Sequence, residues 1–155
     1  MNHPQTDWLQ AAVKRHVPFL DYLNIRPISA GNGRSEFQLT TEEVHLRTFG
    51  ILHGGVTASL LDTAVGFAAV TVAPPGHHVV TVQLNMNFTK TVEAGETLRA
   101  NGAVQHAGQR TAVVQGEVRN AEDDLVAVAT ATMMYLPLPA GAQALLQMEG
   151  DPEDE

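Results

Sequence analysis

One segment of the sequence constrains the fold more than any other. Residues 54–73 form a run of 20 residues that only Gly66 interrupts and that ends at Pro74-Pro75-Gly76. Its apolar residues lie nearly all round a helix, and Asp62 is its only charged residue. Such a helix has to be covered on more than one side. A membrane span of about 30 Å is the alternative, but the hydroxyl side chains within the run favour a helix buried in protein.

Short strands are expected on both sides of this helix. Residues 25–29 and 34–40 read as a pair joined by Gly31-Asn32-Gly33, because Gly and Asn tolerate the positive φ of a tight hairpin. The strand after the helix alternates apolar with polar residues, and its apolar side chains should share one face. These side chains are Val80, Val82, Leu84, Met86 and Phe88. Three more strands follow at 97–106, 110–120 and 125–136.

The order of these elements predicts an α+β fold. Two strands, one long helix and four strands joined by short turns fit a meandering antiparallel sheet that curves around the helix. We expect a single domain over residues 1–137, with a short helix at about 6–16 and a loop at 41–52. Residues 138–155 read as a flexible acidic tail, since five of the 17 acidic residues lie in the last seven positions.

Composition excludes several classes of protein. The chain has no cysteine, which rules out disulfide scaffolds, thiolate metal sites and cysteine nucleophiles. Its net charge of −8 gives no general attraction to nucleic acid or to an anionic membrane. The seven histidines lack the spacing of a metal site, so we expect no metal. No export signal is visible, and we expect a cytoplasmic protein.

The entrance of the long helix is a candidate binding site. It reads His53-Gly54-Gly55, and the first amides of a helix have no partner inside the helix. Together with the helix dipole, the amides of Gly54 and Gly55 can hold an anion or a carbonyl oxygen that is becoming one. The alternative is an ordinary turn from loop to helix.

Asp62 is the most informative single residue. Its neighbours at helical spacing are mostly small, among them Ala58, Ser59 and Gly66, whereas the bulky side chains lie on the opposite side. Such a stripe admits either a second copy of the chain or a thin ligand. A lone carboxylate is costly to bury. Asp62 is therefore either a catalytic or ligand-facing group, or a structural one that faces solvent or donors.

Two further side chains are candidates with open roles. The hydroxyl of Thr81 can hold a water or a substrate, or it is simply a polar residue on a strand. Arg110 beside Gly108 can meet a phosphate, or it is a solvated strand end. The sequence contains no phosphate-binding loop, dinucleotide fingerprint or serine hydrolase elbow.

At this point the motifs resemble a known family, the PaaI-type hotdog-fold acyl-CoA thioesterases. The resemblance covers about residues 18–136. The motifs that carry it are Leu52-His53-Gly54-Gly55-Val56, Asp62 nine residues after the histidine, Asn87-Phe88, Ala94-Gly95-Glu96 and Gly108-Gln109-Arg110-Thr111. It implies a hotdog fold, in which five or six antiparallel strands wrap a central helix. It also implies a homodimer, or a dimer of dimers, with the thioester bound between subunits and no cofactor.

The resemblance also implies roles for individual residues. Asp62 would be the nucleophile or the general base that activates water. Gly55 would donate its amide to the thioester oxygen, His53 would shape the turn, and Thr81 would help to place the water. Gly108 and Arg110 would contact coenzyme A.

One position departs from the family. Relatives often have Asn or Gln about six residues before the histidine, where this chain has Arg47. Either Arg47 takes a different role at the substrate, or His45 or Thr48 substitutes for the missing amide. Two other functions therefore stay open beside hydrolysis: a non-catalytic acyl-CoA-binding module and a hydratase of acyl thioesters.

Overall fold

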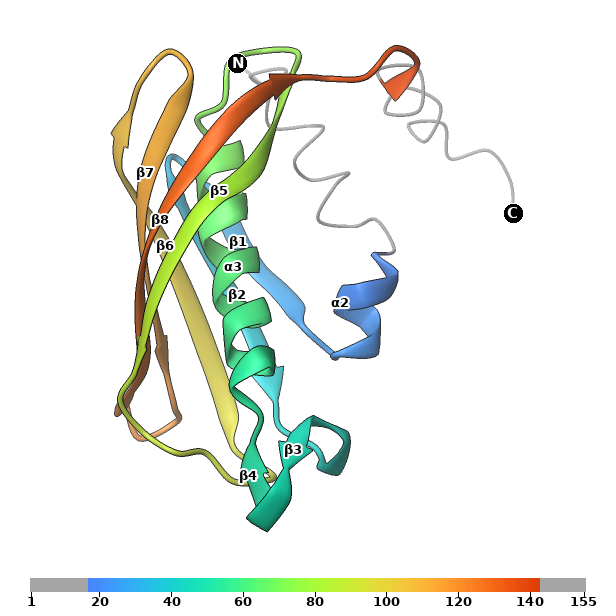
Figure 1. Cartoon of the computed structure of the whole chain (residues 1–155), viewed down its shortest axis with the longest axis vertical. Coiled ribbons are helices and arrows are strands. Elements are labelled where there is room, and N and C mark those ends of the chain that lie inside the picture. Colours follow the sequence, from blue (N-terminus) through green and yellow to red (C-terminus); the bar gives the residue numbers. More distant parts are fainter. Residues whose placement is uncertain (1–16, 143–155) are drawn as a thin grey trace.

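The computed structural model describes residues 17–142, and its centre is one long helix against one sheet (Figure 1). Helix α3 spans Gly54–Val70, and a short helix, α2, spans Pro18–Tyr22. The strands are β1 (Arg26–Gly31), β2 (Arg34–Thr40), β3 (Leu46–Arg47), β4 (Ile51–Leu52), β5 (His77–Phe88), β6 (Thr97–Ala107), β7 (Thr111–Arg119) and β8 (Leu125–Pro137). The 3-10 turns Glu43–His45 and Thr48–Gly50 flank β3. The expected helix at 6–16 and most of the acidic tail lie outside the described residues.

The six-stranded sheet has the order β1-β2-β6-β7-β8-β5, and every pairing is antiparallel. The expected hairpin of β1 and β2 is confirmed, with positive φ at Asn32 and Gly33. The expected meander is correct for β6, β7 and β8 but wrong for β5, which pairs with β8. Eight residues separate β5 from β6. That connection is long enough to cross from one part of the sheet to another, whereas a tight turn would force the two strands to pair.

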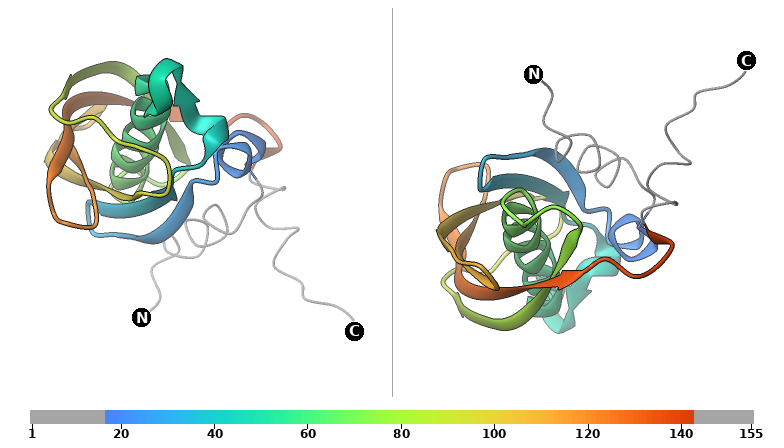
Figure 2. Two further views of the ribbon diagram at one scale, coloured as in Figure 1. Left: turned by 90° about the horizontal axis from the view of Figure 1, so that it is seen from below. Right: turned by 90° about the horizontal axis from the view of Figure 1, so that it is seen from above.

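The sheet curves around α3, as the view along the helix shows (Figure 2). Two glycines let helix and sheet approach closely. A Cβ at Gly102 would lie 2.6 Å from the carbonyl oxygen of Ala64, and one at Gly116 would lie 2.6 Å from a methyl group of Val65. Leu60 and Leu61 are fully buried in this contact. Burial of each such side chain stabilises the fold by about 1.5–3 kcal/mol.

The sheet leaves one face of α3 open. Gly55 is exposed, and Ser59, Asp62 and Gly66 are half-buried. The expected stripe of small residues around one carboxylate is therefore confirmed. The helix ends at Val70 rather than at the predicted Ala73, because the last residues form a turn in which Val72 and Ala73 donate to carbonyls three residues back. None of the helices within 17–142 is long and apolar enough to cross a membrane.

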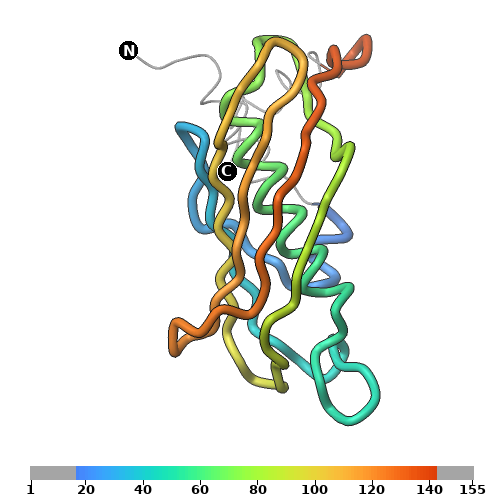
Figure 3. Tube along the Cα trace, turned by 60° about the vertical axis from the view of Figure 1, so that its left-hand side comes forward, coloured from blue at the N-terminus to red at the C-terminus, as the bar shows by residue number. Residues whose placement is uncertain are grey.

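The two edges of the sheet differ (Figure 3). Strand β1 is short, contains Pro27 and has a register shift after it, which are features that protect an edge. Strand β5 has 12 residues and no proline. Two of its valines, Val80 and Val82, are 36% and 55% exposed. An open edge of this length with apolar side chains is a surface for pairing with another chain.

Candidate functional site

Asp62 and Thr81 come together in the structure. Asp62 lies half-buried on the open face of α3, and Thr81 lies on β5, which runs beside the helix. The hydroxyl of Thr81 donates a hydrogen bond of 2.8 Å to Oδ1 of Asp62. The carboxylate is thereby held by one oxygen, and its other oxygen has no protein donor among the residues that the structure describes.

A β-bulge makes this contact possible. In the pairing of β5 with β8, Thr81 lies opposite Met133 and Gln83 opposite Thr132, so that Val82 has no partner. Because an extra residue reverses the alternation, Thr81 and Leu84 both face the helix. The expected face that runs unbroken from Val80 to Phe88 is therefore wrong. The valines at 80 and 82 point away from the helix.

The N-terminus of α3 is capped by its own histidine. His53 is the N-cap residue, and its Nδ1 accepts a hydrogen bond of 2.8 Å from the amide of Gly55. The ring thereby acts as the cap of the helix through its Nδ1 atom. The amide of Gly54 has no acceptor within residues 17–142. The helix start therefore offers the Gly54 amide, while the Gly55 amide is already engaged.

His45 supports this turn from behind. It is 1% exposed, its Nδ1 accepts from the amide of Glu42 at 3.0 Å, and its carbonyl accepts from the amide of His53 at 2.9 Å. It is therefore buried beneath the helix start and is not available to substrate. Thr48, the other residue considered as a substitute for a family amide, is exposed on the β3–β4 hairpin.

Three further candidates lie apart from Asp62. Arg47 is exposed on β3, and its guanidinium makes one long hydrogen bond of 3.4 Å to the carbonyl of Thr48. Gly108 and Arg110 form the turn between β6 and β7, in which the Gly108 amide donates to Thr111. This turn lies at the end of the sheet away from the β3–β4 hairpin (Figure 1). One protomer therefore does not bring Arg110 to the helix start.

The helix start and Asp62 are also separated within one protomer. Gly54 and Asp62 are eight residues apart on α3, which corresponds to about 12 Å along the axis. A carbonyl group bound at the Gly54 amide is then out of reach of the Asp62 carboxylate of the same chain. The two groups can act on one thioester only if a second copy supplies one of them.

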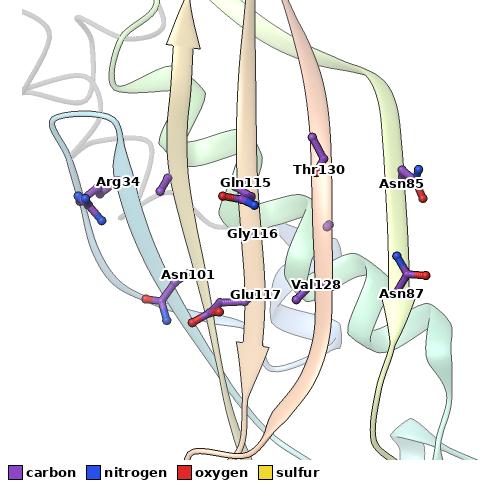
Figure 4. Close-up of a pocket in the computed structure, with 11 residues that line it drawn as sticks. Arg34, Asn85, Asn87, Asn101, Gln115, Gly116, Glu117, Val128 and Thr130 are labelled. Carbon is purple, nitrogen blue, oxygen red and sulfur yellow. The ribbon is translucent and has the colours of Figure 1, made fainter.

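A hollow of about 470 Å³ lies on the opposite face of the sheet. Figure 4 shows polar side chains that project from β2, β5, β6, β7 and β8 away from the helix. They include Arg34, Asn85, Asn87, Asn101, Gln115, Glu117 and Thr130. Of these, Glu117 is bound by Arg119, which raises the pKa of the Arg119 guanidinium. The hollow is not on the side of Asp62.

The structure gives no indication of a metal centre in the part of the chain that it describes. No group of three or more His, Cys, Asp or Glu side chains is placed to hold a metal ion there. Among the described residues, the hydrogen bond from Lys90 lowers the pKa of the Asp124 carboxyl. That pair lies on the surface between the β5–β6 loop and the β7–β8 turn, outside the candidate site.

Comparison with known families and structures agrees with this architecture. The model of the thioesterase superfamily matches residues 49–127, which include the helix start, Asp62 and Thr81. The 1,4-dihydroxy-2-naphthoyl-CoA hydrolase of Listeria monocytogenes is 29% identical over 112 residues, which cover 72% of this chain and 89% of that protein.

Solved structures give the same result. The PaaI protein of the Escherichia coli phenylacetic acid degradation operon superposes with a TM-score of 0.78 at 26% identity, covering 86% of this chain and 96% of that one. The Streptococcus mutans protein smu.793, solved bound to acetyl CoA, superposes with a TM-score of 0.71 at 28% identity over 80% of this chain and 94% of its own. These likenesses confirm the predicted hotdog fold.

Proposed function

This chain belongs to the thioesterase superfamily, and we propose on that basis that it hydrolyses acyl-CoA thioesters to a free acid and coenzyme A. Two of the similar proteins support this substrate class. One is named as a hydrolase of an aryl-CoA, and the other is solved with acetyl CoA bound. The observation that carries the proposal is the half-buried carboxylate of Asp62, held by Thr81 on the open face of the central helix.

Asp62 is the reacting carboxylate of the proposal. As a general base, it takes a proton from a water molecule while the water oxygen bonds to the carbonyl carbon. The tetrahedral intermediate then breaks its carbon–sulfur bond and releases the coenzyme A thiol, which receives the proton. As a nucleophile, the carboxylate itself bonds to the carbonyl carbon, and the carbon–sulfur bond breaks to release the coenzyme A thiolate and leave an anhydride. Water then hydrolyses the anhydride to the free acid and the Asp62 carboxylate, and a proton from that water goes to the thiolate. In both routes Thr81 holds Oδ1 and leaves the other oxygen for the reaction.

The oxyanion donor of the proposal is the Gly54 amide. The expectation from the sequence was Gly55, but its amide is donated to His53 Nδ1. Gly54 is the first helical residue and its amide is unused among the described residues. A single donor of this kind is typically worth about 3 kcal/mol in the transition state. His53 then keeps the role of shaping the turn, because its ring caps the next amide.

A homodimer completes the site in this proposal. The open edge of β5 and the small-residue face of α3 lie on the same side of the protomer, and a second copy can cover both. Antiparallel pairing of two β5 strands sets the two helices side by side in opposite directions. Asp62 of one copy can then face the Gly54 amide of the other. Gly108 and Arg110 would lie beside the partner's helix start, where they can bind coenzyme A.

The hollow on the outer face supports a dimer of dimers. Its carboxamides, Asn85, Asn87, Asn101 and Gln115, make no hydrogen bond within residues 17–142. A carboxamide carries both donors and an acceptor and so can pair with its own copy. The only carboxylate there is neutralised by Arg119. Arg34, which also lines the hollow, has no acidic partner among the described residues and leaves one positive charge per copy on this face.

Asp62→Asn tests the proposal directly. Release of coenzyme A from short, long and aryl acyl-CoA is measured with a thiol reagent for both proteins. We expect turnover by the wild type, and a loss of at least about 100-fold in Asp62→Asn with an unchanged circular dichroism spectrum. Unchanged turnover in the variant would refute the role of Asp62. Binding of acyl-CoA by the wild type without turnover would show a binding module, and hydration of an enoyl-CoA would show a hydratase.

A further inference from the structure

We propose that Arg47 is a further catalytic residue, whose guanidinium binds the thioester oxygen as it becomes negative and then the carboxylate of the product acid. This inference rests on the proposed hydrolysis. It assigns a positive charge to the oxyanion site, where the structure otherwise offers a neutral amide.

Strand register places Arg47 beside the helix start. In the β3–β4 pair, Arg47 lies opposite Ile51 and Leu46 lies opposite Leu52. The pairing continues with the hydrogen bond from the His53 amide to the His45 carbonyl. Because side chains alternate along a strand, Arg47 and Ile51 share a face with His53. Arg47 and His53 are diagonal neighbours, about 7–8 Å apart at the backbone, a separation that a long side chain can span.

The guanidinium of Arg47 is available for a ligand. It is exposed, and its one hydrogen bond, to the carbonyl of Thr48, is 3.4 Å long. No carboxylate of the described residues lies within ion-pair distance of it. Four other cations of the described residues, Arg26, Lys90, Arg99 and Arg119, have acidic partners, whereas Arg34 and Arg110 share with Arg47 the lack of one but lie away from the helix start.

This availability is informative because acids surround the hairpin. Glu42 and Glu43 precede it, and Glu93 bridges to Ile51. Arg47 pairs with none of them and instead shares the face of His53. A guanidinium is planar, stays charged and presents parallel N–H donors that match two oxygens on one carbon. The complementary ligand is therefore a carboxylate or a tetrahedral oxyanion.

Hydrolysis of the thioester produces both a tetrahedral oxyanion and a carboxylate at the helix start. When water or Asp62 bonds to the carbonyl carbon, the electron pair of the carbon–oxygen double bond moves to the oxygen. That oxygen, at the Gly54 amide, then carries a full negative charge within reach of Arg47. Departure of the thiol restores the double bond, and the acid leaves as a carboxylate. Arg47 should therefore both lower the barrier and retain the product.

A phosphate of coenzyme A is the alternative partner for Arg47. The pantetheine arm separates the phosphates of coenzyme A from its thioester, whereas the register puts Arg47 next to the donors for the thioester oxygen. The two partners give different results with an acyl-pantetheine substrate, which has the same thioester and lacks the nucleotide.

Steady-state kinetics of Arg47→Met, Arg47→Lys and the control Arg99→Met on acyl-CoA and acyl-pantetheine test the inference. We expect Arg47→Met to lower kcat at least about 10-fold on both substrates, with KM changed less than about 3-fold. Arg47→Lys should recover part of the loss. The free acid should inhibit the wild type and Arg99→Met more strongly than Arg47→Met. Arg99→Met removes an equal charge from β6 and should keep its kcat.

Two outcomes would overturn the inference. One is an unchanged kcat in Arg47→Met, and the other is a defect that appears only as a raised KM for acyl-CoA, which would assign Arg47 to a phosphate. Thermal unfolding of each variant checks that the fold is intact. Asp62→Asn separates this inference from the proposed function. If Asp62→Asn is inactive and Arg47→Met is fully active, hydrolysis at Asp62 stands and only the role of Arg47 fails.

Discussion

The hydroxyl of Thr81 donates a 2.8 Å hydrogen bond to Oδ1 of Asp62, and this contact joins strand β5 to the open face of helix α3. It exists because the bulge at Val82 turns Thr81 toward the helix. A hydrogen bond to a charged group contributes about 1.5–3 kcal/mol. The contact is therefore strong enough to set the orientation of the carboxylate.

Removal of this hydroxyl should slow the reaction without unfolding the protein. Thr81→Val keeps the branched shape and loses the donor, so we expect kcat to fall about tenfold, which corresponds to 1.4 kcal/mol. Thr81→Ser keeps the donor and should retain most of the activity. Coenzyme A release is the measurement. Equal activity of the Val and Ser variants would show that Thr81 does not act through its hydroxyl.

The amide of Gly54 can be removed with little other change. Gly54 is the first helical residue, a position where proline is well tolerated, and the φ of −66° and ψ of 129° at His53 suit a residue before proline. Gly54→Pro should lower kcat about 100-fold. Gly54→Ala keeps the amide, and its Cβ would lie 3.4 Å from the Phe88 ring in ordinary contact, so it serves as the steric control. A proline variant as active as the alanine variant would exclude this amide as the donor.

Gly66 tests the assembly. A Cβ at this position meets nothing within 4 Å, so a lysine fits the protomer and improves helix propensity. A lysine on this face would, however, obstruct a second copy. We expect Gly66→Lys to be a monomer by light scattering at micromolar concentration and to lose activity, whereas Gly66→Ala stays a dimer. A dimeric Gly66→Lys, or a monomeric wild type, would contradict the proposed interface.

Tyr135 tests the account of stability. Its side chain is 6% exposed, and its hydroxyl has no partner among the residues described. Burial raises the pKa of its phenol. Tyr135→Phe should be as stable as the wild type at pH 7, or more stable by about 1 kcal/mol. Urea unfolding gives the free energy of unfolding of both proteins.

The difference in the free energy of unfolding between the wild type and Tyr135→Phe should depend on pH, because burial raises the pKa of Tyr135. Because the folded pKa is raised, the unfolded state loses the phenol proton first, starting near its ordinary value of about 10. The wild type should therefore keep its full stability below that pH and lose stability relative to Tyr135→Phe as the pH rises toward the folded pKa. A difference between the two proteins that does not change between pH 8 and 11 would contradict this.

Much of the fold follows from residue patterns within single elements. The breaker-free run from Gly54 predicts α3, and Gly31-Asn32-Gly33 predicts the first hairpin, because each depends on local chemistry. The place of β5 does not follow in this way. Its pairing with β8 is decided by how the chain returns from α3, and the alternation of its side chains shows no sign of the bulge at Val82.

The candidate site also contains residues that the sequence indicates and residues that only the three-dimensional structure identifies. Asp62 stands out in the sequence because it is the single charge in an apolar helix. The sequence does not show which of the amides of Gly54 and Gly55 is free, since that depends on which amide the His53 ring reaches. That Arg47 has no acidic partner could not be foreseen either, because it depends on where the nearby acids point. The register that pairs Arg47 with Ile51 could not be predicted either, because the sequence indicates only a loop at 41–52.

The central claim is that Asp62 of one protomer acts with the Gly54 amide of another, and a mixed dimer tests it most directly. Asp62→Asn and Gly54→Pro chains are co-expressed with different tags and purified as heterodimers, and coenzyme A release is measured. Each parent should be inactive, but the heterodimer should have one intact site and about half of the wild-type activity. A heterodimer as inactive as its parents would show that the two groups do not act across the interface.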